Sequence, residues 1–289
     1  MRLQVPEYIV KTPAGLEEAL QILAEEPGVW RPMAGGTDVM VPPPHVPEHT
    51  CYLNLQSLDE LRGIRFDEEG VVIGALTTYT ELRESRGIHE MFPNLIKSAK
   101  ATAALAIQNR GTLGGNIMNG SPAADTPPSL MAYGAEVELS SIRGTRWVEL
   151  DRFWTGYKAF DRQSDELLTR IRIRRPEGWS FHFYRKVGSR AAQAISKASF
   201  AAYAQIEQGK VQVFRVAVGA VAPSCVRARH AEAVVLGRPL AALPIQEARR
   251  AIQEDICPID DFRSTAEYRR LVISNVLGQM LEELAALGH

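Results

Sequence analysis

The sequence predicts an α+β protein built from two domains, and three observations support this prediction. The chain has 289 residues and a mass of 31.9 kDa, enough for two domains of ordinary size. Its carboxy-terminal part shows strand patterns followed by helix patterns, an order typical of α+β folds. Between strand patterns at 167–173 and 180–186, the segment Arg174-Arg175-Pro176-Glu177-Gly178 interrupts regular structure. We therefore expect a first domain over 1–176 and a second over 177–289.

The first domain begins with a predicted helix and a short strand. Thr12 suits the N-cap and Pro13 suits the first helical position. An apolar stripe follows at helical spacing, formed by Leu16, Ala19, Leu20 and Leu23. Pro27-Gly28 ends this pattern, and residues 29–34 are predicted to be extended.

The rest of the first domain alternates between strand and helix patterns. Residues 71–76 are predicted to form a buried strand, and a helix is expected to open at residue 77. The alanine-rich stretch 95–107 favours a helix. Residues 111–128 are rich in glycine, asparagine and proline and are predicted to be a long loop, and such loops are usually functional. Strands are expected at 135–140 and 167–173.

The second domain is predicted to combine a hairpin with two helices. Strand patterns at 198–206 and 211–221 are joined by Glu207-Gln208-Gly209-Lys210, a spacing typical of a hairpin. Helices are expected at 243–255 and 264–287, the second opened by a capping box of Ser264 and Glu267. The core face of that last helix is predicted to consist of Tyr268, Leu271, Val272, Val276, Met280 and Leu284.

Charge and composition exclude several classes of protein. Lys plus Arg total 33 and Asp plus Glu total 34, so the net charge is −1, which argues against a nucleic-acid binder. No apolar stretch is long enough to span a bilayer and the amino terminus has no signal-peptide pattern, so we expect a cytoplasmic protein. The scattered Cys51, Cys225 and Cys257 suit neither a disulfide framework nor an iron–sulfur or zinc site.

Two glycine pairs carry the strongest functional signal. In Ala34-Gly35-Gly36-Thr37-Asp38, adjacent glycines permit positive φ, and successive N–H groups can form a nest for phosphate. For this segment taken alone, a tight turn after a strand is the preferred explanation. The second segment runs from Arg110-Gly111-Thr112-Leu113-Gly114-Gly115-Asn116 to Ser121-Pro122-Ala123-Ala124-Asp125. Together the two segments are predicted to clamp a pyrophosphate, with Asp125 accepting hydrogen bonds from a ribose or an adenine amine.

These segments resemble the two flavin-binding loops of the molybdenum hydroxylase flavoprotein subunits, the medium subunits of carbon monoxide dehydrogenase and bacterial xanthine dehydrogenase-like enzymes. The similarity continues in the family's order and covers nearly the whole chain. It includes Ile73-Gly74-Ala75-Leu76-Thr77-Thr78, Leu167-Leu168-Thr169, Arg185-Lys186-Val187-Gly188-Ser189-Arg190 and Ile195-Ser196-Lys197. The resemblance implies a PCMH or vanillyl-alcohol-oxidase-like FAD-binding domain of two α+β subdomains, about 1–57 and 58–176, followed by a smaller carboxy-terminal sheet-and-helix domain.

The resemblance also implies where FAD would bind. The residues it places along the diphosphate and ribityl chain are Arg31, Pro32, Met33, Ala34, Gly35, Gly36, Thr37, Asp38 and Val39. Those it places on the opposite side are Thr112, Gly115, Asn116 and Asn119. Asp125 is expected at the adenosine end, and Leu168 and Lys186 near the isoalloxazine ring. The position that carries a ring-stacking aromatic in eukaryotic relatives falls near Thr102, so the ring-stacking group stays open.

By resemblance, the chain is an FAD-binding redox subunit of a multi-subunit molybdenum hydroxylase. A small subunit with [2Fe–2S] clusters and a large molybdenum-cofactor subunit are the implied partners. Electrons would reach FAD from the clusters and leave for NAD⁺, oxygen or a quinone. Two other interpretations stay open: a self-contained flavin oxidase or reductase, and a non-catalytic assembly protein of the same fold. An additional four-iron cluster, found in one branch of the family, is excluded because the cysteines are too few and too dispersed.

Three further features have ordinary explanations that we prefer. His45 and His49 have the spacing of helical metal ligands, but Pro44 and Pro47 oppose a helix there. Lys186 is either a surface lysine with a buried stem or, by resemblance, a cation that stabilises reduced flavin. The alternating arginines favour a solvated sheet face over a subunit contact; they are Arg170, Arg172 and Arg174.

Overall fold

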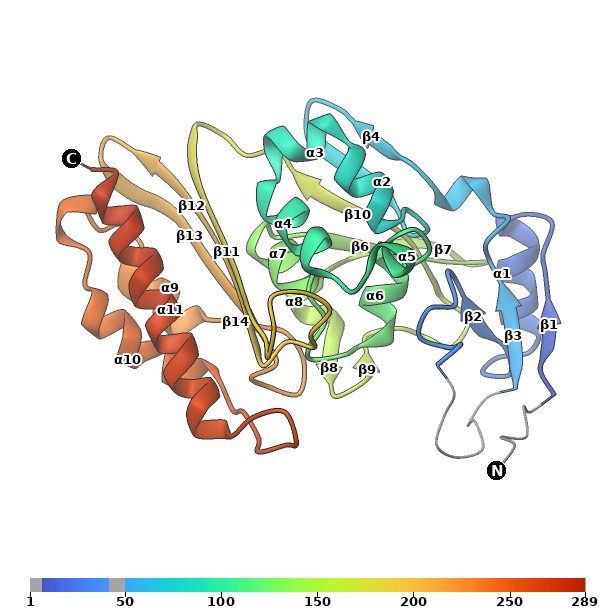
Figure 1. The fold of residues 1–289 in the computed structure, drawn as a ribbon. Coiled ribbons are helices and arrows are strands. Elements are labelled where there is room, and N and C mark those ends of the chain that lie inside the picture. The colour runs from blue at the N-terminus through green and yellow to red at the C-terminus, as the bar shows by residue number, and fades with distance from the viewer. Residues whose placement is uncertain (1–6, 42–49, 289) are drawn as a thin grey trace.

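The computed structural model describes residues 7–41 and 50–288, which form three larger sheets and one two-stranded sheet, with helices packed against them (Figure 1). The first sheet is parallel, with strand order β1-β3-β2. It consists of β1 (Ile9–Lys11), β2 (Arg31–Met33) and β3 (Cys51–Asn54), and α1 (Leu16–Glu25) packs on it. Ala19 and Leu23 of α1 are fully buried together with Leu53 of β3.

The first helix begins later than the sequence predicts. Its N-cap is Gly15, whereas Thr12 was expected to cap it, so that prediction is wrong. The Thr12 hydroxyl instead accepts a hydrogen bond from Asn54 Nδ2 at 3.4 Å, which ties the preceding loop to the end of β3.

The second sheet has five antiparallel strands in the order β4-β5-β10-β6-β7. These strands are β4 (Ile64–Phe66), β5 (Gly70–Gly74), β6 (Glu136–Ser141), β7 (Gly144–Glu149) and β10 (Leu167–Arg174). One face carries the main core of this region, where sheet residues such as Ile73 and Ile171 pack with helix residues such as Leu82 and Leu95. The helices on this face are α2 (Tyr79–Glu84), α3 (Arg86–Met91), α4 (Pro93–Ala101), α5 (Leu105–Gln108), α6 (Leu113–Asn119) and α7 (Pro127–Ala132).

The arginine row on β10 lies on the opposite, partly exposed face, as predicted. Arg172 Nη2 contacts Glu136 Oε2 at 2.8 Å, and Arg170 Nη1 contacts Glu138 Oε1 at 3.3 Å. Both carboxylates come from the adjacent strand β6, so these ion pairs run across the strands. Near β7 the chain adds α8 (Leu150–Phe153) and a small two-stranded sheet of β8 (Trp154–Gly156) and β9 (Ala159–Phe160).

Two predictions for residues 95–128 are wrong. The expected single helix over 95–107 is two helices, because Ala103 has φ +45° and separates α4 from α5. The expected long loop over 111–128 contains the helix α6 and the start of α7. The glycines of α6 are tolerated because Thr112 caps the helix and the tertiary structure supplies acceptors for its first N–H groups.

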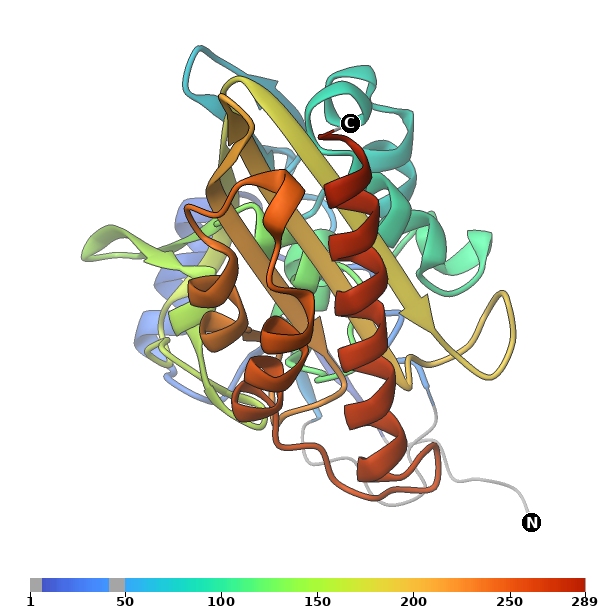
Figure 2. The same ribbon diagram turned by 90° about the vertical axis from the view of Figure 1, so that its left-hand side faces the viewer.

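The carboxy-terminal domain is a four-stranded antiparallel sheet, β11-β12-β13-β14, with helices on one face (Figure 2). Its strands are β11 (Trp179–Val187), β12 (Ala198–Glu207), β13 (Lys210–Gly219) and β14 (Val226–Arg227). The covering helices are α9 (Arg229–Val235), α10 (Ile245–Asp255) and α11 (Ala266–Ala286). Short 3-10 helices lie at Asp59–Leu61 and Leu240–Ala242.

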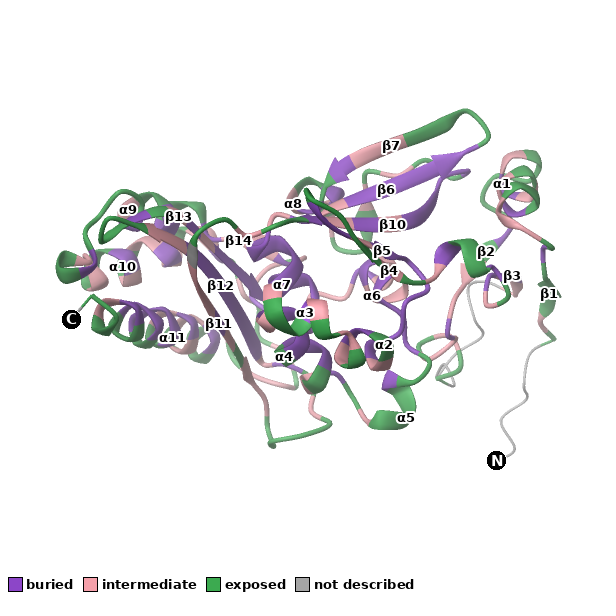
Figure 3. Ribbon diagram, turned by 90° about the horizontal axis from the view of Figure 1, so that it is seen from above, coloured by how far each residue is buried: buried purple, intermediate pink, exposed green. Residues whose placement is uncertain are grey.

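Both faces of this sheet are buried, as Figure 3 shows for β12 and β13. Phe200, Ala202 and Ala204 of β12 pack under the helices, whereas Ala201 and Tyr203 pack into the core of the first domain. Hydrogen bonds strengthen this contact between the domains: Asn94 Nδ2 donates to Ala202 O at 2.8 Å, and Ala220 N donates to Pro122 O at 2.7 Å. One face of this sheet therefore shares a core with the first domain, and the face under the helices has a core of its own.

The predicted start of the last helix is also wrong. Thr265 is the N-cap and its hydroxyl accepts from Tyr268 N at 3.2 Å, so Ser264 and Glu267 form no capping box. Of the predicted core face, Val276, Met280 and Leu284 are buried, whereas Tyr268 and Leu271 are exposed and Ile273 and Leu277 are buried in addition. None of the helices among the described residues is long and apolar enough to cross a membrane.

Candidate functional site

The first glycine pair forms an open turn directly after β2. Gly36 has φ +72°, a conformation that favours glycine. Within the part of the chain that the structure describes, the backbone N–H groups of residues 35–39 have no hydrogen-bond acceptor. Polar backbone groups are normally paired, so a row of unpaired donors indicates a ligand that accepts from them.

The second glycine pair lies inside the first turn of α6 and has a different environment. Thr112 Oγ1 accepts from Gly115 N at 3.1 Å, and Thr112 O accepts from Asn116 N at 3.0 Å. Leu113 N donates to Thr77 O, and Gly114 N donates to Ala75 O, each at 2.9 Å. The first N–H groups of this helix are therefore used within the protein.

Gly114 is required by packing. A Cβ atom at this position would lie 2.6 Å from Ala75 Cβ and 2.8 Å from Ala75 O. Because real Cβ atoms do not approach so closely, only glycine allows α6 to lie this near the end of β5.

The two segments lie against each other, as the sequence predicts. A Cβ atom at Gly115 would lie 3.7 Å from Ala34 Cβ, and Asn119 Nδ2 donates to Asp38 Oδ1 at 3.2 Å. Gly35 packs directly on the Arg110 backbone, and Arg110 Nε donates to Gly35 O at 3.3 Å. The arrangement is a donor-rich turn held against a capped helix, and not a pair of loops with equivalent roles.

Asp125 and Lys186 form a buried ion pair beside these segments. Lys186 Nζ lies 2.7 Å from Asp125 Oδ2 and also donates to Ala101 O at 2.9 Å. Ser196 Oγ donates to Asp125 Oδ1 at 2.8 Å. Burial raises the pKa of Asp125, and the Lys186 ammonium and the Ser196 hydroxyl oppose that shift.

This ion pair corrects one prediction. Asp125 and Lys186 were expected at opposite ends of FAD, but their side chains lie 2.7 Å apart and therefore belong to the same end. Thr102 directly follows the Ala101 carbonyl that Lys186 contacts, so the cluster lies at the expected ring-stacking position. Leu168, 4% exposed in β10, belongs to the core of the same domain.

Sequence reasoning gave no role to Arg110 and Ser196, although both lie in the quoted motifs. Their side chains join segments that are far apart in the chain, Arg110 to Gly35 and Ser196 to Asp125. Two further polar side chains of the site have partners: Asn116 Oδ1 accepts from Thr126 Oγ1 at 2.6 Å, and Thr102 Oγ1 donates to Ser98 O.

Metal chemistry has no support among the residues that the structure describes, where no cluster of His, Cys, Asp and Glu could hold an ion. His45 and His49 lie outside those residues. The three cysteines are free: Cys225 is buried, Cys51 is half-buried and Cys257 is exposed. Burial raises the pKa of Cys225, so its thiol stays protonated at neutral pH.

Comparison with protein families agrees with this geometry. The model of the FAD binding domain in molybdopterin dehydrogenase matches residues 6–176. The model of the CO dehydrogenase flavoprotein C-terminal domain matches residues 182–284. The unpaired donors of residues 35–39 fit an FAD diphosphate, so fold and site define an FAD-binding flavoprotein.

Relatives with known roles specify the family. The chain is 31% identical over 278 residues to the xanthine dehydrogenase FAD-binding subunit of Escherichia coli O157:H7, covering 94% of each chain. It is 29% identical over 287 residues to the carbon monoxide dehydrogenase medium chain of Hydrogenophaga pseudoflava, covering 96% and 95%. A solved structure of carbon monoxide dehydrogenase from the same organism superimposes with a TM-score of 0.92 at 28% identity, covering 97% and 98%. The chain belongs to the family of FAD-binding medium subunits of molybdenum hydroxylases, and it is a subunit of an oxidoreductase.

Proposed function

We propose that this chain carries electrons through its FAD from the iron–sulfur clusters of a partner subunit to an external acceptor. The observation that supports this most directly is the row of unpaired backbone donors at residues 35–39, packed against α6. When bound, FAD supplies the redox chemistry, since it can take up and release electrons singly or in pairs. The protein holds the cofactor and sets its surroundings.

For the FAD contacts, we propose that residues 31–39 follow the diphosphate and ribityl chain. Thr112, Gly115, Asn116 and Asn119 would face the cofactor from α6. Asp125, Leu168 and Lys186 would then lie at one end of the bound FAD. The contact of Lys186 with Ala101, next to Thr102, favours the isoalloxazine end for all three.

Lys186 is proposed to place a positive charge near the ring. Its ammonium is held by Asp125 and the Ala101 carbonyl and has a side-chain exposure of 13%, so solvent screens it weakly. Asp125 offsets much of this charge, but an ammonium has three N–H donors and Asp125 and Ala101 take two of them, so one is left for an electron-rich atom of the reduced flavin.

The proposed partners are a small subunit with [2Fe–2S] clusters and a large subunit with the molybdenum cofactor. Exposed apolar side chains flank the FAD segments: Met40 follows the first turn, Leu105 lies on α5, and Ile195 adjoins Ser196. Apolar groups exposed beside a cofactor site suit a protein contact. We propose this rim as the contact with the iron–sulfur subunit, and NAD⁺, oxygen or a quinone as the acceptor.

The division into units at about 57 and 176 is also proposed. The parallel sheet ends at Asn54, and the interruption at Arg175 to Gly178 lies between β10 and β11. A cytoplasmic location is proposed because the three cysteines are free thiols, as is usual in a reducing compartment.

Reconstitution of the purified full-length chain tests this function. The chain should bind FAD, and acid precipitation should release all of the yellow colour into the supernatant because the binding is non-covalent. It should pass electrons from NADH to an artificial dye at most, and hydroxylate no purine, aldehyde or aromatic substrate until both partner subunits are added. Turnover of such a substrate by the chain alone would favour a self-contained flavoenzyme. A colourless chain that still assembles with the partners would favour an assembly protein.

A further inference from the structure

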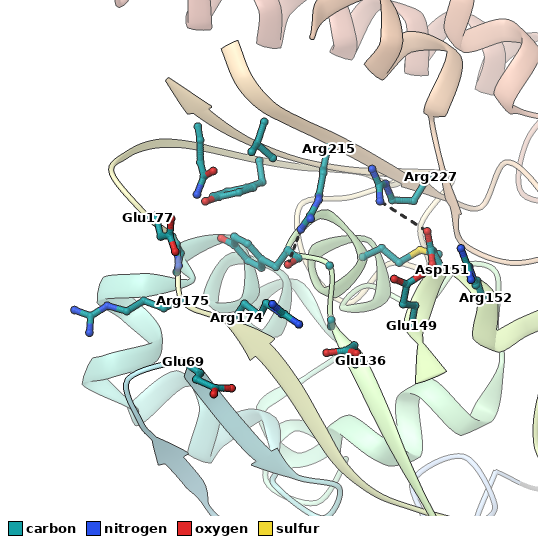
Figure 4. A pocket seen from close by; sticks show the side chains of 18 of the residues that line it. Glu69, Glu136, Glu149, Asp151, Arg152, Arg174, Arg175, Glu177, Arg215 and Arg227 are labelled. Carbon is teal, nitrogen blue, oxygen red and sulfur yellow. Dashed lines mark hydrogen bonds and ion pairs between the residues drawn. The ribbon is translucent and has the colours of Figure 1, made fainter. Parts of the chain in front are cut away.

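A large cleft lies between the two domains, away from the FAD segments (Figure 4). Its volume is about 1010 Å³. One wall is formed by the end of β10 and the neighbouring ends of β6 and β7, and the other by β12 and β13. Lys186 lies near the far end of β11, seven residues and therefore about 23 Å from the first residue of that strand. The cleft is therefore separate from the FAD site.

Most acidic groups deep in this cleft already have arginine partners. Asp151 contacts both Arg227 and Arg229. Glu149 Oε2 contacts Arg152 Nε at 3.2 Å, and Glu136 contacts Arg172 from the adjacent strand. Each of these carboxylates therefore forms an ion pair with an arginine other than Arg174 or Arg215.

Three arginines that line the cleft have no carboxylate partner among the described residues: Arg174, Arg175 and Arg215. Arg215 extends from β13 and Arg174 from the end of β10, and both point into the opening from opposite walls (Figure 4). The Arg215 side chain makes one hydrogen bond within this part of the chain, from Nη1 to Tyr133 O at 3.1 Å. A guanidinium has five N–H donors, so most of the donors of Arg215 are free for a ligand.

Electrostatics favours an anion between these two groups. Arg215 is half-buried, so its charge is poorly solvated and lacks a directly bound counter-charge. Glu68, Glu69 and Glu177 also line the cleft, but they are exposed and solvent screens them. Their negative charge repels a long polyanion such as a nucleic acid, but it does not prevent a compact anion from binding between the two arginines.

We propose that this cleft binds a compact multivalent oxyanion, a phosphate ester or a small polycarboxylate, held between Arg174 and Arg215. Guanidinium groups bind phosphate and carboxylate oxygens in pairs of parallel hydrogen bonds. One arginine comes from each domain, so the ligand ties the FAD-binding domain to the carboxy-terminal domain and stabilises their contact. The site offers a means of regulating the subunit that is independent of FAD.

Calorimetric titration of the FAD-saturated full-length chain tests the proposal. The probes are pyrophosphate for the phosphate class and citrate for the carboxylate class, both at constant ionic strength so that general screening is held fixed. Saturating FAD blocks pyrophosphate binding at residues 35–39. At least one probe should bind with one-to-one stoichiometry and raise the melting temperature.

Matched variants locate the binding. Arg174→Gln and Arg215→Lys should each weaken binding by about tenfold, because each removes a paired set of hydrogen bonds. Arg175→Gln is the control: it removes the same charge from a residue that also lines the cleft, but whose side chain points away from the space between Arg174 and Arg215 (Figure 4). FAD content should be unchanged in all three variants. Equal binding by Arg174→Gln and Arg175→Gln, or no saturable binding of either probe, would overturn the proposal. If neither small anion binds and the Arg174→Gln variant assembles less well with a partner subunit, the cleft binds an acidic protein segment instead.

Discussion

The two glycine pairs of this chain have the same sequence but different structural roles. Gly35-Gly36 forms an open turn whose following N–H groups have no acceptor among the described residues. Gly114-Gly115 lies in the first turn of a capped helix whose N–H groups are all bonded within the protein. The first pair leaves donors for a ligand, and the second pair allows the helix to approach the sheet.

This difference shows that a glycine pair alone does not identify a phosphate site. Both segments occur in polar surroundings, and both were expected to contribute donors to one clamp. At Gly36 the backbone needs positive φ, whereas at Gly114 a side chain has no room because Ala75 is too close. Substitution at Gly36 should therefore affect FAD binding and substitution at Gly114 should affect folding, whereas a Cβ at Gly35 would collide with the Arg110 carbonyl.

Gly114→Val should produce the largest effect, and it should act on folding. The added Cβ would collide with the backbone and side chain of Ala75, neither of which is free to move. We expect the FAD-free variant to lose about 3 kcal/mol of unfolding free energy, with the loss measured by urea denaturation followed by circular dichroism. Unchanged stability would mean that α6 does not need the close approach.

Gly36→Val should act on FAD instead. Valine strains the positive-φ turn and turns the N–H groups of residues 35–39 away from FAD, although among the described residues only Met40 and Met33 lie within 4 Å of the new Cβ. We expect FAD affinity to fall by about a hundredfold, measured by flavin fluorescence, while the FAD-free chain loses about 1 kcal/mol. Full flavin occupancy with unchanged affinity would contradict the proposal that residues 35–39 bind the FAD diphosphate.

Lowering the pH should reduce the unfolding free energy of Gly36→Val and Gly114→Val by the same amount, because the acid-sensitive group lies at the domain contact and not at either glycine pair. His182 is hydrogen-bonded to Tyr133 and Ser180 at the domain contact, and burial lowers its pKa to about 4. Because the unfolded chain binds this proton near pH 6.5, stability is complete above about pH 6.5 and falls as the pH decreases toward 4.

The loss attributable to His182 should be roughly 2 kcal/mol, reduced from its full value by partial solvent exposure. His182→Gln should flatten the acid side of the stability profile, and the profile is obtained from urea midpoints between pH 4 and 8. A parallel profile in Gly36→Val would confirm that this substitution leaves the domain contact intact. An unaltered profile in His182→Gln would assign the acid sensitivity to other groups.

Two threonine substitutions, one in each glycine segment, should give the smallest effects and should again separate folding from FAD binding. Thr112 caps α6, so Thr112→Ala should cost about 1 kcal/mol in the FAD-free chain. The Thr37 side chain has no hydrogen-bond partner among the described residues, so Thr37→Ala should leave unfolding unchanged and weaken only FAD binding. Thermal melts with and without FAD measure both variants, and a stability loss in Thr37→Ala would contradict the distinction.

The sequence predicted the central strands of both large sheets, because their apolar patterns are long and regular, but it missed β4, β7 and β14. The hairpin of β12 and β13 and the strands at 71–76 and 167–173 appear as expected. Helix starts were less predictable: Thr12 and Ser264 are good capping residues by type, yet Gly15 and Thr265 take those positions. The choice depends on packing, since the helix must direct its buried residues into a core that sequence alone does not place.

The sequence by itself determined the fold class, the family and the two segments that meet at the site, because these depend on local patterns and on quoted motifs in a fixed order. Only the tertiary structure decided what each segment does. Whether an N–H group is free depends on carbonyls that arrive from elsewhere, such as Ala75 and Thr77 for α6. In the same way, Asp125 and Lys186, 61 residues apart, became one ion pair through packing of the two domains. Sequence spacing carries no information about such distances, so the chemistry of the site is fixed only when the chain folds.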